Sequence, residues 1–178
     1  MTHKDVSPVP TVADATRLQP TVLVAAAVVI EGGRVLVTQR KAGTHLGGFW
    51  ELPGGKVGPG EDPRAALARE LREEIGIGVS VGEILDVTFY RYEPADRTVL
   101  LLFFEAHRDE GSPEPQALDV AAWAWATGAE LDASRFPPAD GPVLEKVKEM
   151  LKIDRAGRPP RQSAARALPT GTRPAPRK

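Results

Sequence analysis

The chain has 178 residues, 42% of them hydrophobic, and a formal net charge of −1, which fits one domain with a packed core. It contains no cysteine, so disulfides, thiol catalysis and thiolate zinc sites are excluded. The longest apolar run, Val22 to Ile30, is too short to span a bilayer, and no secretory signal precedes it. We therefore expect a cytoplasmic protein without a membrane partner.

Charge is spread unevenly along the chain. Residues 154–178 hold seven basic residues and one acid, whereas residues 1–153 hold 16 basic and 23 acidic residues. Proline content and missing periodicity predict a flexible leader over residues 1–20 and a disordered basic tail over 154–178. The two interpretations of this tail are weak contact with a polyanion and a solvated appendage. The tail has no aromatic residues for base stacking, which favours the appendage, so no stable nucleic-acid partner is expected.

The folded body is expected over residues 21–153. Apolar or alternating segments between turn residues predict strands over 21–30, 35–40, 49–52, 79–92, 98–107 and 121–126. The fourth and fifth of these would form a long hairpin. An apolar stripe at helical spacing predicts a helix over 142–153. Strands with helices on two faces indicate an α/β sandwich built on a mixed sheet.

A second helix carries its own start and stop signals. Asp62 can cap it, Pro63 suits its first position, and Gly76 suits the position just past its end. An apolar stripe that would pack on the core runs along it through Leu67, Ala68, Leu71 and Ile75.

Three acids share another stripe of this helix. Glu70, Glu73 and Glu74 lie within an arc of roughly 100° and repel each other by about 0.2–0.5 kcal/mol per pair. A hard divalent cation removes this repulsion and accepts carboxylate ligands. The preceding glycine-rich run over 53–60 lets the backbone approach a ligand closely. The stretch therefore predicts a magnesium cradle and chemistry on phosphates, with a solvated face paired to arginines as the alternative.

The whole string matches the Nudix box, G-x5-E-x7-R-E-U-x-E-E-x-G-U, where U is a bulky aliphatic residue. The matching residues are Gly55, Glu61, Arg69, Glu70, Leu71, Glu73, Glu74, Gly76 and Ile77. The chain thus resembles the Nudix hydrolases, which cleave nucleoside diphosphates linked to another moiety, and the resemblance implies the Nudix α/β/α sandwich. Segments 49–56 and 136–143 are similar to MutT-type enzymes, which hydrolyse 8-oxo-dGTP to the monophosphate and pyrophosphate.

The resemblance implies roles for the box residues. Glu70, Glu73 and Glu74 would be the catalytic and metal-binding carboxylates, with the Gly54 carbonyl as a further ligand. The metal would be Mg²⁺, with Mn²⁺ as a substitute. Four further box residues would be structural, namely Gly55, Glu61, Arg69 and Gly76. Of these, Glu61 and Arg69 would pair and so hold the loop against the helix.

MutT-like chains carry one more acid ahead of a strand that ends in Trp. Aligning on Trp125 places Asp119 at this position. The family usually has Glu there, and Asp is one methylene shorter. Asp119 is therefore expected to act on the metal through water or to be only a loop acid, with Glu114 as a nearby substitute.

Substrate-binding residues follow from the same resemblance. Arg40 and Lys56 would face the phosphates, while Leu52 and Arg97 would contact the nucleotide, Arg97 at the base. The alternative for both arginines is a surface residue at a strand end or hairpin tip. His45 lies in a predicted loop and is given no catalytic role.

Asp140 replaces the Asn that MutT-type sequences use to recognise 8-oxoguanine. Asn both donates and accepts, whereas an ionised Asp only accepts. An ionised Asp140 would take the N7 proton of 8-oxoguanine but repel O6, unless it is itself protonated. It would instead suit the N4 amine of cytosine, and chains resembling CTP pyrophosphohydrolases also have Pro-Ala-Asp here. The remaining alternative is that Asp140 caps the final helix.

The leading hypothesis is a Mg²⁺-dependent nucleoside triphosphate pyrophosphohydrolase, with 8-oxo-dGTP as first candidate substrate and nucleotide-pool sanitation as its role. Water attack at the β-phosphorus, with Glu70 or Glu73 as base, would release pyrophosphate. CTP, dCTP or a 5-modified cytosine nucleotide is the alternative substrate. A non-catalytic nucleotide-binding module is the alternative from another class, although the intact box disfavours it. Monomer and homodimer both stay open.

Overall fold

The computed structural model describes residues 20–93, 97–157 and 168, without the side chains of 154–157. The predicted flexible leader, the hairpin turn at 94–96 and nearly all of the predicted basic tail lie outside the described residues. The final helix extends to Gly157, so the first residues assigned to the tail are helical. No helix within the described ranges has the length and apolar character needed to cross a membrane.

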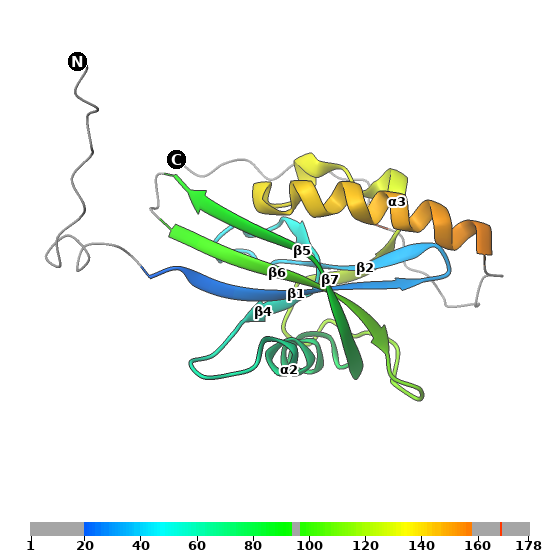
Figure 1. Cartoon of the computed structure of the whole chain (residues 1–178), viewed down its shortest axis with the longest axis horizontal. Helices are drawn as coiled ribbons and strands as arrows, with labels where there is room; N and C mark the ends of the chain where they lie inside the picture. Colours follow the sequence, from blue (N-terminus) through cyan, green and yellow to red (C-terminus); the bar gives the residue numbers. More distant parts are fainter. Residues whose placement is uncertain (1–19, 94–96, 158–167, 169–178) are drawn as a thin grey trace, which may run out of the picture.

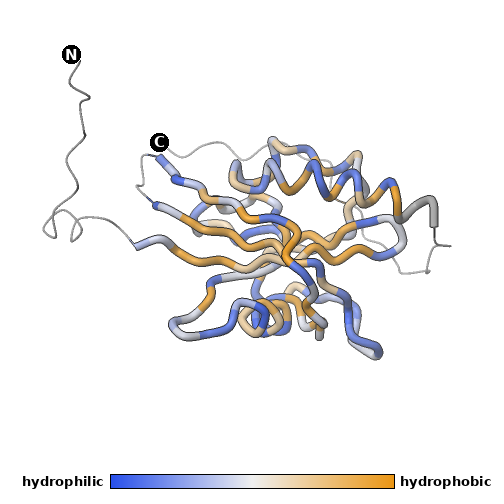
Figure 2. Tube along the Cα trace, viewed as in Figure 1, coloured by the Kyte–Doolittle hydropathy of each residue, from blue (hydrophilic) through white to orange (hydrophobic). Residues whose placement is uncertain are grey.

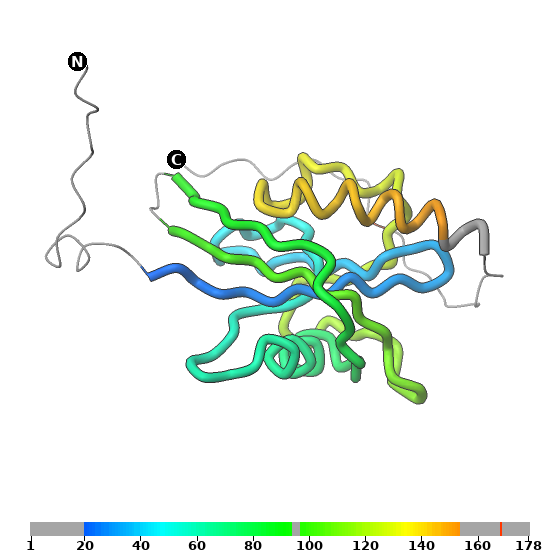
Figure 3. Tube along the Cα trace, in the orientation of Figure 1, coloured from blue at the N-terminus to red at the C-terminus, as the bar shows by residue number. Residues whose placement is uncertain are grey.

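Within the described residues, the strands form one mixed sheet in the order β3-β2-β1-β6-β5, with β4 also paired to β1 and β7 to β2. The strands are β1 (Val22–Glu31), β2 (Arg34–Gln39), β3 (Trp50–Glu51), β4 (Gly54–Lys56), β5 (Val79–Tyr92), β6 (Arg97–Arg108) and β7 (Ala122–Ala126). The pairing of β1 with β6 is parallel, while the other pairs are antiparallel. The predicted hairpin is therefore present, and it attaches to the first strand through a parallel ladder (Figure 3).

Two helices cover opposite faces of the sheet, α2 (Pro63–Ile75) on one and α3 (Gly141–Gly157) on the other (Figure 1). The strands between them are mostly apolar (Figure 2). Ala25 and Ala27 of β1 join the core under α2, whereas Ala26 and Val28 join the core under α3. This alternation of a strand buried on both faces confirms the α/β sandwich.

Helix α2 begins and ends as its sequence predicts. Asp62 Oδ1 accepts hydrogen bonds from the backbone N–H groups of Arg64 (2.9 Å) and Ala65 (3.2 Å). Gly76 follows the last turn with a φ of 74° in the left-handed region. Such a conformation favours glycine, which is why the helix ends here.

The buried face of α2 is wider than the predicted stripe. Ala66 is buried, together with Leu67, Leu71 and Ile75, while Ala68 is only partly buried. At about 100° per residue, Glu70 and Glu74 project between Ala66 and Leu67, inside the face that meets the sheet, whereas Glu73 projects outside it. The acidic stripe therefore overlaps the core-facing side of the helix.

The glycine-rich run was expected to be a loop, but part of it is a strand. Residues 54–56 pair with β1 as strand β4. Gly55 and Gly54 lie opposite Ala25 and Ala26. Side chains this small leave room for close backbone approach, which explains a strand where the composition indicates a loop. Three short 3₁₀ helices that were not predicted, η1 (Gly128–Glu130), η2 (Ala133–Arg135) and η3 (Pro138–Asp140), lead from β7 to α3.

Candidate active site

Glycines bring β4 against both β1 and α2. Gly54 has a φ of 152°, and a Cβ atom there would overlap the Ala25 carbonyl oxygen. A Cβ atom at Gly55 would overlap the carboxylate of Glu70. The Glu70 carboxylate thus packs against the bare backbone of Gly55, and it would have to move if a Cβ atom were present there.

Arg69 joins the loop before α2 to the acidic face of the helix. Its Nε and Nη2 atoms donate to Glu61 Oε1 (2.9 Å) and Oε2 (3.0 Å). Its Nη1 atom donates to Glu70 Oε1 (2.8 Å) and Glu73 Oε2 (3.1 Å). Hydrogen bonds from Arg69, and then from the backbone of Gly58, lower the pKa of Glu61 to about 2. The expected pair of Glu61 and Arg69 is present, and Arg69 also holds two of the three helical glutamates.

Glu74 is the helical glutamate without a hydrogen bond to Arg69. Its Oε2 atom is buried and has no hydrogen-bond partner among the described residues. Burial, followed by the negative charges of Glu51 and Glu70, raises the pKa of Glu74 to about 8. A carboxyl group in this state is one that a neighbouring cation would ionise.

These oxygen donors suit a hard divalent cation such as Mg²⁺. The unpartnered Glu74 oxygen and the Glu70 carboxylate against bare Gly55 backbone fit such an ion. Within the described ranges, no three acidic or histidine side chains already converge on one point that could hold a metal. Glu70 and Glu73 instead face Arg69. Metal binding at Glu70 would therefore take place beside the ion pair of Glu70 Oε1 with Arg69.

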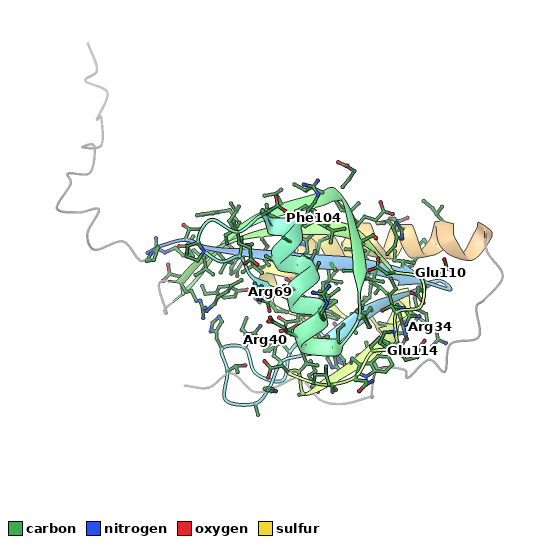
Figure 4. The ribbon with its side chains drawn as sticks, turned by 90° about the horizontal axis from the view of Figure 1, so that it is seen from below. Arg34, Arg40, Arg69, Phe104, Glu110 and Glu114 are labelled. Atoms are coloured by element: carbon green, nitrogen blue, oxygen red, sulfur yellow. The ribbon has the colours of Figure 1, made fainter. Side chains whose placement is uncertain are left out.

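Arg40 follows β2 and is held by protein groups. Its Nη1 atom donates to Glu51 Oε2 (2.8 Å), and its Nε atom donates to the backbone carbonyl of His45 (2.8 Å). Figure 4 shows Arg40 and Arg69 on the same side of α2. Arg40, which is predicted to face phosphate, is thus held next to the acidic cluster formed by Glu70, Glu73 and Glu74.

Glu51 acts electrostatically on both Glu74 and Asp140, and the sequence analysis did not identify it. Its charge contributes to the raised pKa values of both Glu74 and Asp140, and burial raises the pKa of Glu51 itself. The sequence does contain a signal for Glu51. It lies between the apolar residues Trp50 and Leu52, which are buried in one core, so its side chain points to the opposite face of the sheet.

One pocket collects all the predicted substrate residues, namely Arg40, Leu52, Lys56, Arg97 and Asp140. Its apolar wall includes Val24 and Ala26 of β1 and Leu101 and Phe103 of β6. His45 also lines it and contacts the Tyr92 ring edge to face, with ring centroids 5.0 Å apart. A largely apolar cleft with a few converging polar groups is the usual form of a small-molecule site.

Asp140 lies at the end of η3 with only 4% of its surface exposed. Burial, and then the charge of Glu51, raise the pKa of Asp140 well above its usual range. Burial and the charge of Asp140 together raise the pKa of Tyr92 to about 12, so the two polar groups are neighbours. The alternative role of Asp140 as the cap of α3 stays a prediction.

Asp119 lies near the acidic cluster but faces outward. Its backbone N–H donates to the carbonyl of Glu74 (3.0 Å), and its charge contributes to the raised pKa of Glu74. Its exposed carboxylate pairs with Lys41. Glu114 is not the nearby substitute that the sequence indicated, because it pairs with Arg108 (3.3 Å) on the side of α2 away from Arg40 (Figure 4).

Comparison with known proteins places this arrangement in context. The NUDIX domain family matches residues 20–147. The chain is 36% identical to the 8-oxo-dGTP diphosphatase of Escherichia coli over 120 residues, which cover 67% of this chain and 90% of that protein. It is 38% identical to the CTP pyrophosphohydrolase of Escherichia coli over 136 residues, which cover 76% of this chain and 95% of that protein.

A solved structure agrees with the sequence matches. The MutT NUDIX hydrolase from Burkholderia pseudomallei has a TM-score of 0.65 and 26% identity, over 72% of this chain and 99% of that chain. The family match spans the helical glutamates, Arg40 and the pocket.

Proposed function

The chain belongs to the NUDIX domain family and is a Nudix hydrolase, and from this premise we propose a Mg²⁺-dependent nucleoside triphosphate pyrophosphohydrolase. Mn²⁺ would substitute for Mg²⁺. The main support for this proposal is the buried Oε2 atom of Glu74, which has no hydrogen-bond partner among the described residues. With a pKa of about 8, this carboxyl would need a nearby cation to be fully ionised at neutral pH. Glu70, Glu73 and the Gly54 carbonyl would complete the ligands, with Asp119 reaching the ion through water. A bound ion would neutralise the phosphates and polarise water.

The protein groups divide the remaining work. Glu70 would orient and deprotonate the attacking water, because it packs against Gly55 at the pocket while Glu73 is exposed. Arg40 and Lys56 would bind the phosphates and place the β-phosphorus for attack. Water attack at the β-phosphorus would break the bond from that phosphorus to the oxygen that bridges it to the α-phosphorus. The nucleoside monophosphate would leave, and the oxygen of the attacking water would end in pyrophosphate.

8-oxo-dGTP is the substrate that the Asp140 environment favours. Burial raises the pKa of Asp140 well above its ordinary value, which favours the protonated form of this carboxyl. A protonated carboxyl donates one hydrogen bond and accepts others. It can therefore donate to O6 and accept from the N7 proton of 8-oxoguanine, as Asn would. The enzyme would thus remove an oxidised nucleotide before DNA synthesis, with Arg97 and Leu52 contacting the nucleotide.

A cytosine nucleotide is the second candidate. The 38% identity to a CTP pyrophosphohydrolase favours it, as would an ionised Asp140 accepting from N4. A non-catalytic nucleotide-binding module is a third candidate, which would bind nucleotide without metal and without pyrophosphate release.

Pyrophosphate release from 8-oxo-dGTP, dGTP, CTP and 5-methyl-dCTP, with Mg²⁺ and with EDTA, tests these alternatives. We expect the largest kcat/KM for 8-oxo-dGTP. Asp140→Asn should keep that activity and lower turnover of cytosine nucleotides, while Asp132→Asn, in the exposed cap of η2, serves as matched control. Loss of 8-oxo-dGTP turnover in Asp140→Asn, with CTP turnover intact, would contradict the base assignment.

We also infer a cytoplasmic location, where nucleoside triphosphates are available to the enzyme. Its partner would be the nucleotide substrate. Monomer and homodimer are both compatible with the proposed activity. Light scattering after size exclusion distinguishes the two states.

A further inference from the structure

Thr38 carries a buried polar group to which the proposed reaction gives no role. Its exposed fraction is 0%, and its Oγ1 atom has no hydrogen-bond partner within the described ranges. An unsatisfied buried hydroxyl costs about 1–3 kcal/mol. A functional state that supplies a partner would remove this cost.

The sheet register places Thr38 at the acidic cluster. Thr38 is the direct partner of Glu51 on β3. It lies on the same face of β2 as Leu36, which belongs to the core under α2, whereas Val37 belongs to the core under α3. The Cβ atoms of such cross-strand partners are about 4.5–5.5 Å apart, so the hydroxyl lies beside the Glu51 side chain on the α2 face.

Glu74 supplies the second buried oxygen without a partner. Its Oε2 atom comes from α2, which covers the same face of the sheet. Glu51 lies close enough to Glu74 for its charge to act on that carboxyl. A hydroxyl can donate and an ionised carboxylate only accepts, so Thr38 and Glu74 are complementary.

We propose that Thr38 is a positioning residue for the metal site, whose hydroxyl holds the Glu74 carboxylate through one bridging water molecule. Thr38, Glu74 and Glu51 together supply the two to four polar partners that a buried water requires. The hydrogen bond would keep Oε2 of Glu74 oriented toward the cation. Groups that orient metal ligands are typically worth about 10- to 100-fold in metal affinity. The inference rests on the metal-dependent function proposed above.

Thr38→Val tests the hydroxyl, because it keeps the shape of the side chain and removes the donor. Mn²⁺ dissociation constants are measured by electron paramagnetic resonance titration, alongside urea unfolding in EDTA. We expect Thr38→Val to weaken Mn²⁺ binding about 10-fold without lowering metal-free stability. Thr38→Ser, which keeps the hydroxyl, should bind Mn²⁺ within about twofold of the wild type.

Thr88 provides a matched control. Its Oγ1 atom is also buried without a partner, but it lies opposite Leu101 on the α3 side of the sheet. Thr88→Val should leave Mn²⁺ affinity unchanged. Equal affinity in Thr38→Val and the wild type overturns the inference, as does a Thr38→Ser affinity as weak as that of Thr38→Val. Failure of the wild type itself to bind Mn²⁺ overturns the proposed function as well.

Discussion

Replacing Glu74 by Gln should change metal-free stability in opposite directions at pH 5 and pH 8. The pKa of Glu74 rises from 4.5 to about 8 in the folded protein. Between these values the folded state binds more protons than the unfolded state, so this group makes stability fall as pH rises. Gln has no charge to develop, so the variant does not share this loss.

The magnitude follows from the pKa difference. At 1.36 kcal/mol per pKa unit, ionisation of Glu74 destabilises the folded state by about 4 kcal/mol at pH 8. A Gln amide in the same place leaves a buried donor unpaired, at about 1–3 kcal/mol. Glu74→Gln should therefore be about 2 kcal/mol more stable than wild type at pH 8 and about 1 kcal/mol less stable at pH 5.

Urea unfolding followed by tryptophan fluorescence in EDTA measures both differences. Glu73→Gln is the matched control, because Glu73 is exposed on the same helix and its ion pair with Arg69 contributes at most about 1 kcal/mol. Mg²⁺ at pH 8 should then stabilise the wild type and leave Glu74→Gln unchanged. A stability difference of the same sign and size at both pH values would refute the reasoning.

Three further changes test other parts of the site. Gly55→Ala places a methyl group against Glu70 and should lower kcat/KM about 100-fold. Gly128→Ala is the control, because its methyl group meets only Leu151 at 3.9 Å and should not lower kcat/KM. Equal pyrophosphate release by both variants would contradict this prediction. Asp62→Ala removes the α2 cap and should lower the free energy of unfolding by about 1 kcal/mol in urea with KM unchanged; unchanged stability would argue against the cap. EDTA should abolish pyrophosphate release and added Mg²⁺ should restore it, so turnover that persists in EDTA would exclude a metal-dependent reaction.

Local sequence patterns were sufficient for helix α2 and most strands. Asp62, Pro63 and Gly76 act within one turn of the backbone that they cap, so their effect is independent of the rest of the fold. The pairing of Glu61 with Arg69 was expected from the resemblance to the Nudix box, and the two side chains are hydrogen bonded.

The acidic stripe shows where local reasoning stops. Helical spacing places Glu70, Glu73 and Glu74 on one side of α2, and it treats them alike. Packing against the sheet distinguishes them, because Glu74 is buried beside Glu51 while Glu73 remains exposed. Burial and neighbouring charges decide the pKa of a carboxyl group, and both depend on segments distant in the chain.

The pocket and the buried Thr38 hydroxyl are likewise products of the tertiary structure. Sequence alone determined the family, the helix with its glutamates and the list of candidate substrate residues. Only the fold brought Arg40, Leu52 and Asp140 to one cleft and set Thr38 opposite Glu51. The physical reason is that strand pairing and helix docking join residues far apart in sequence, and propensity and periodicity report only on near neighbours.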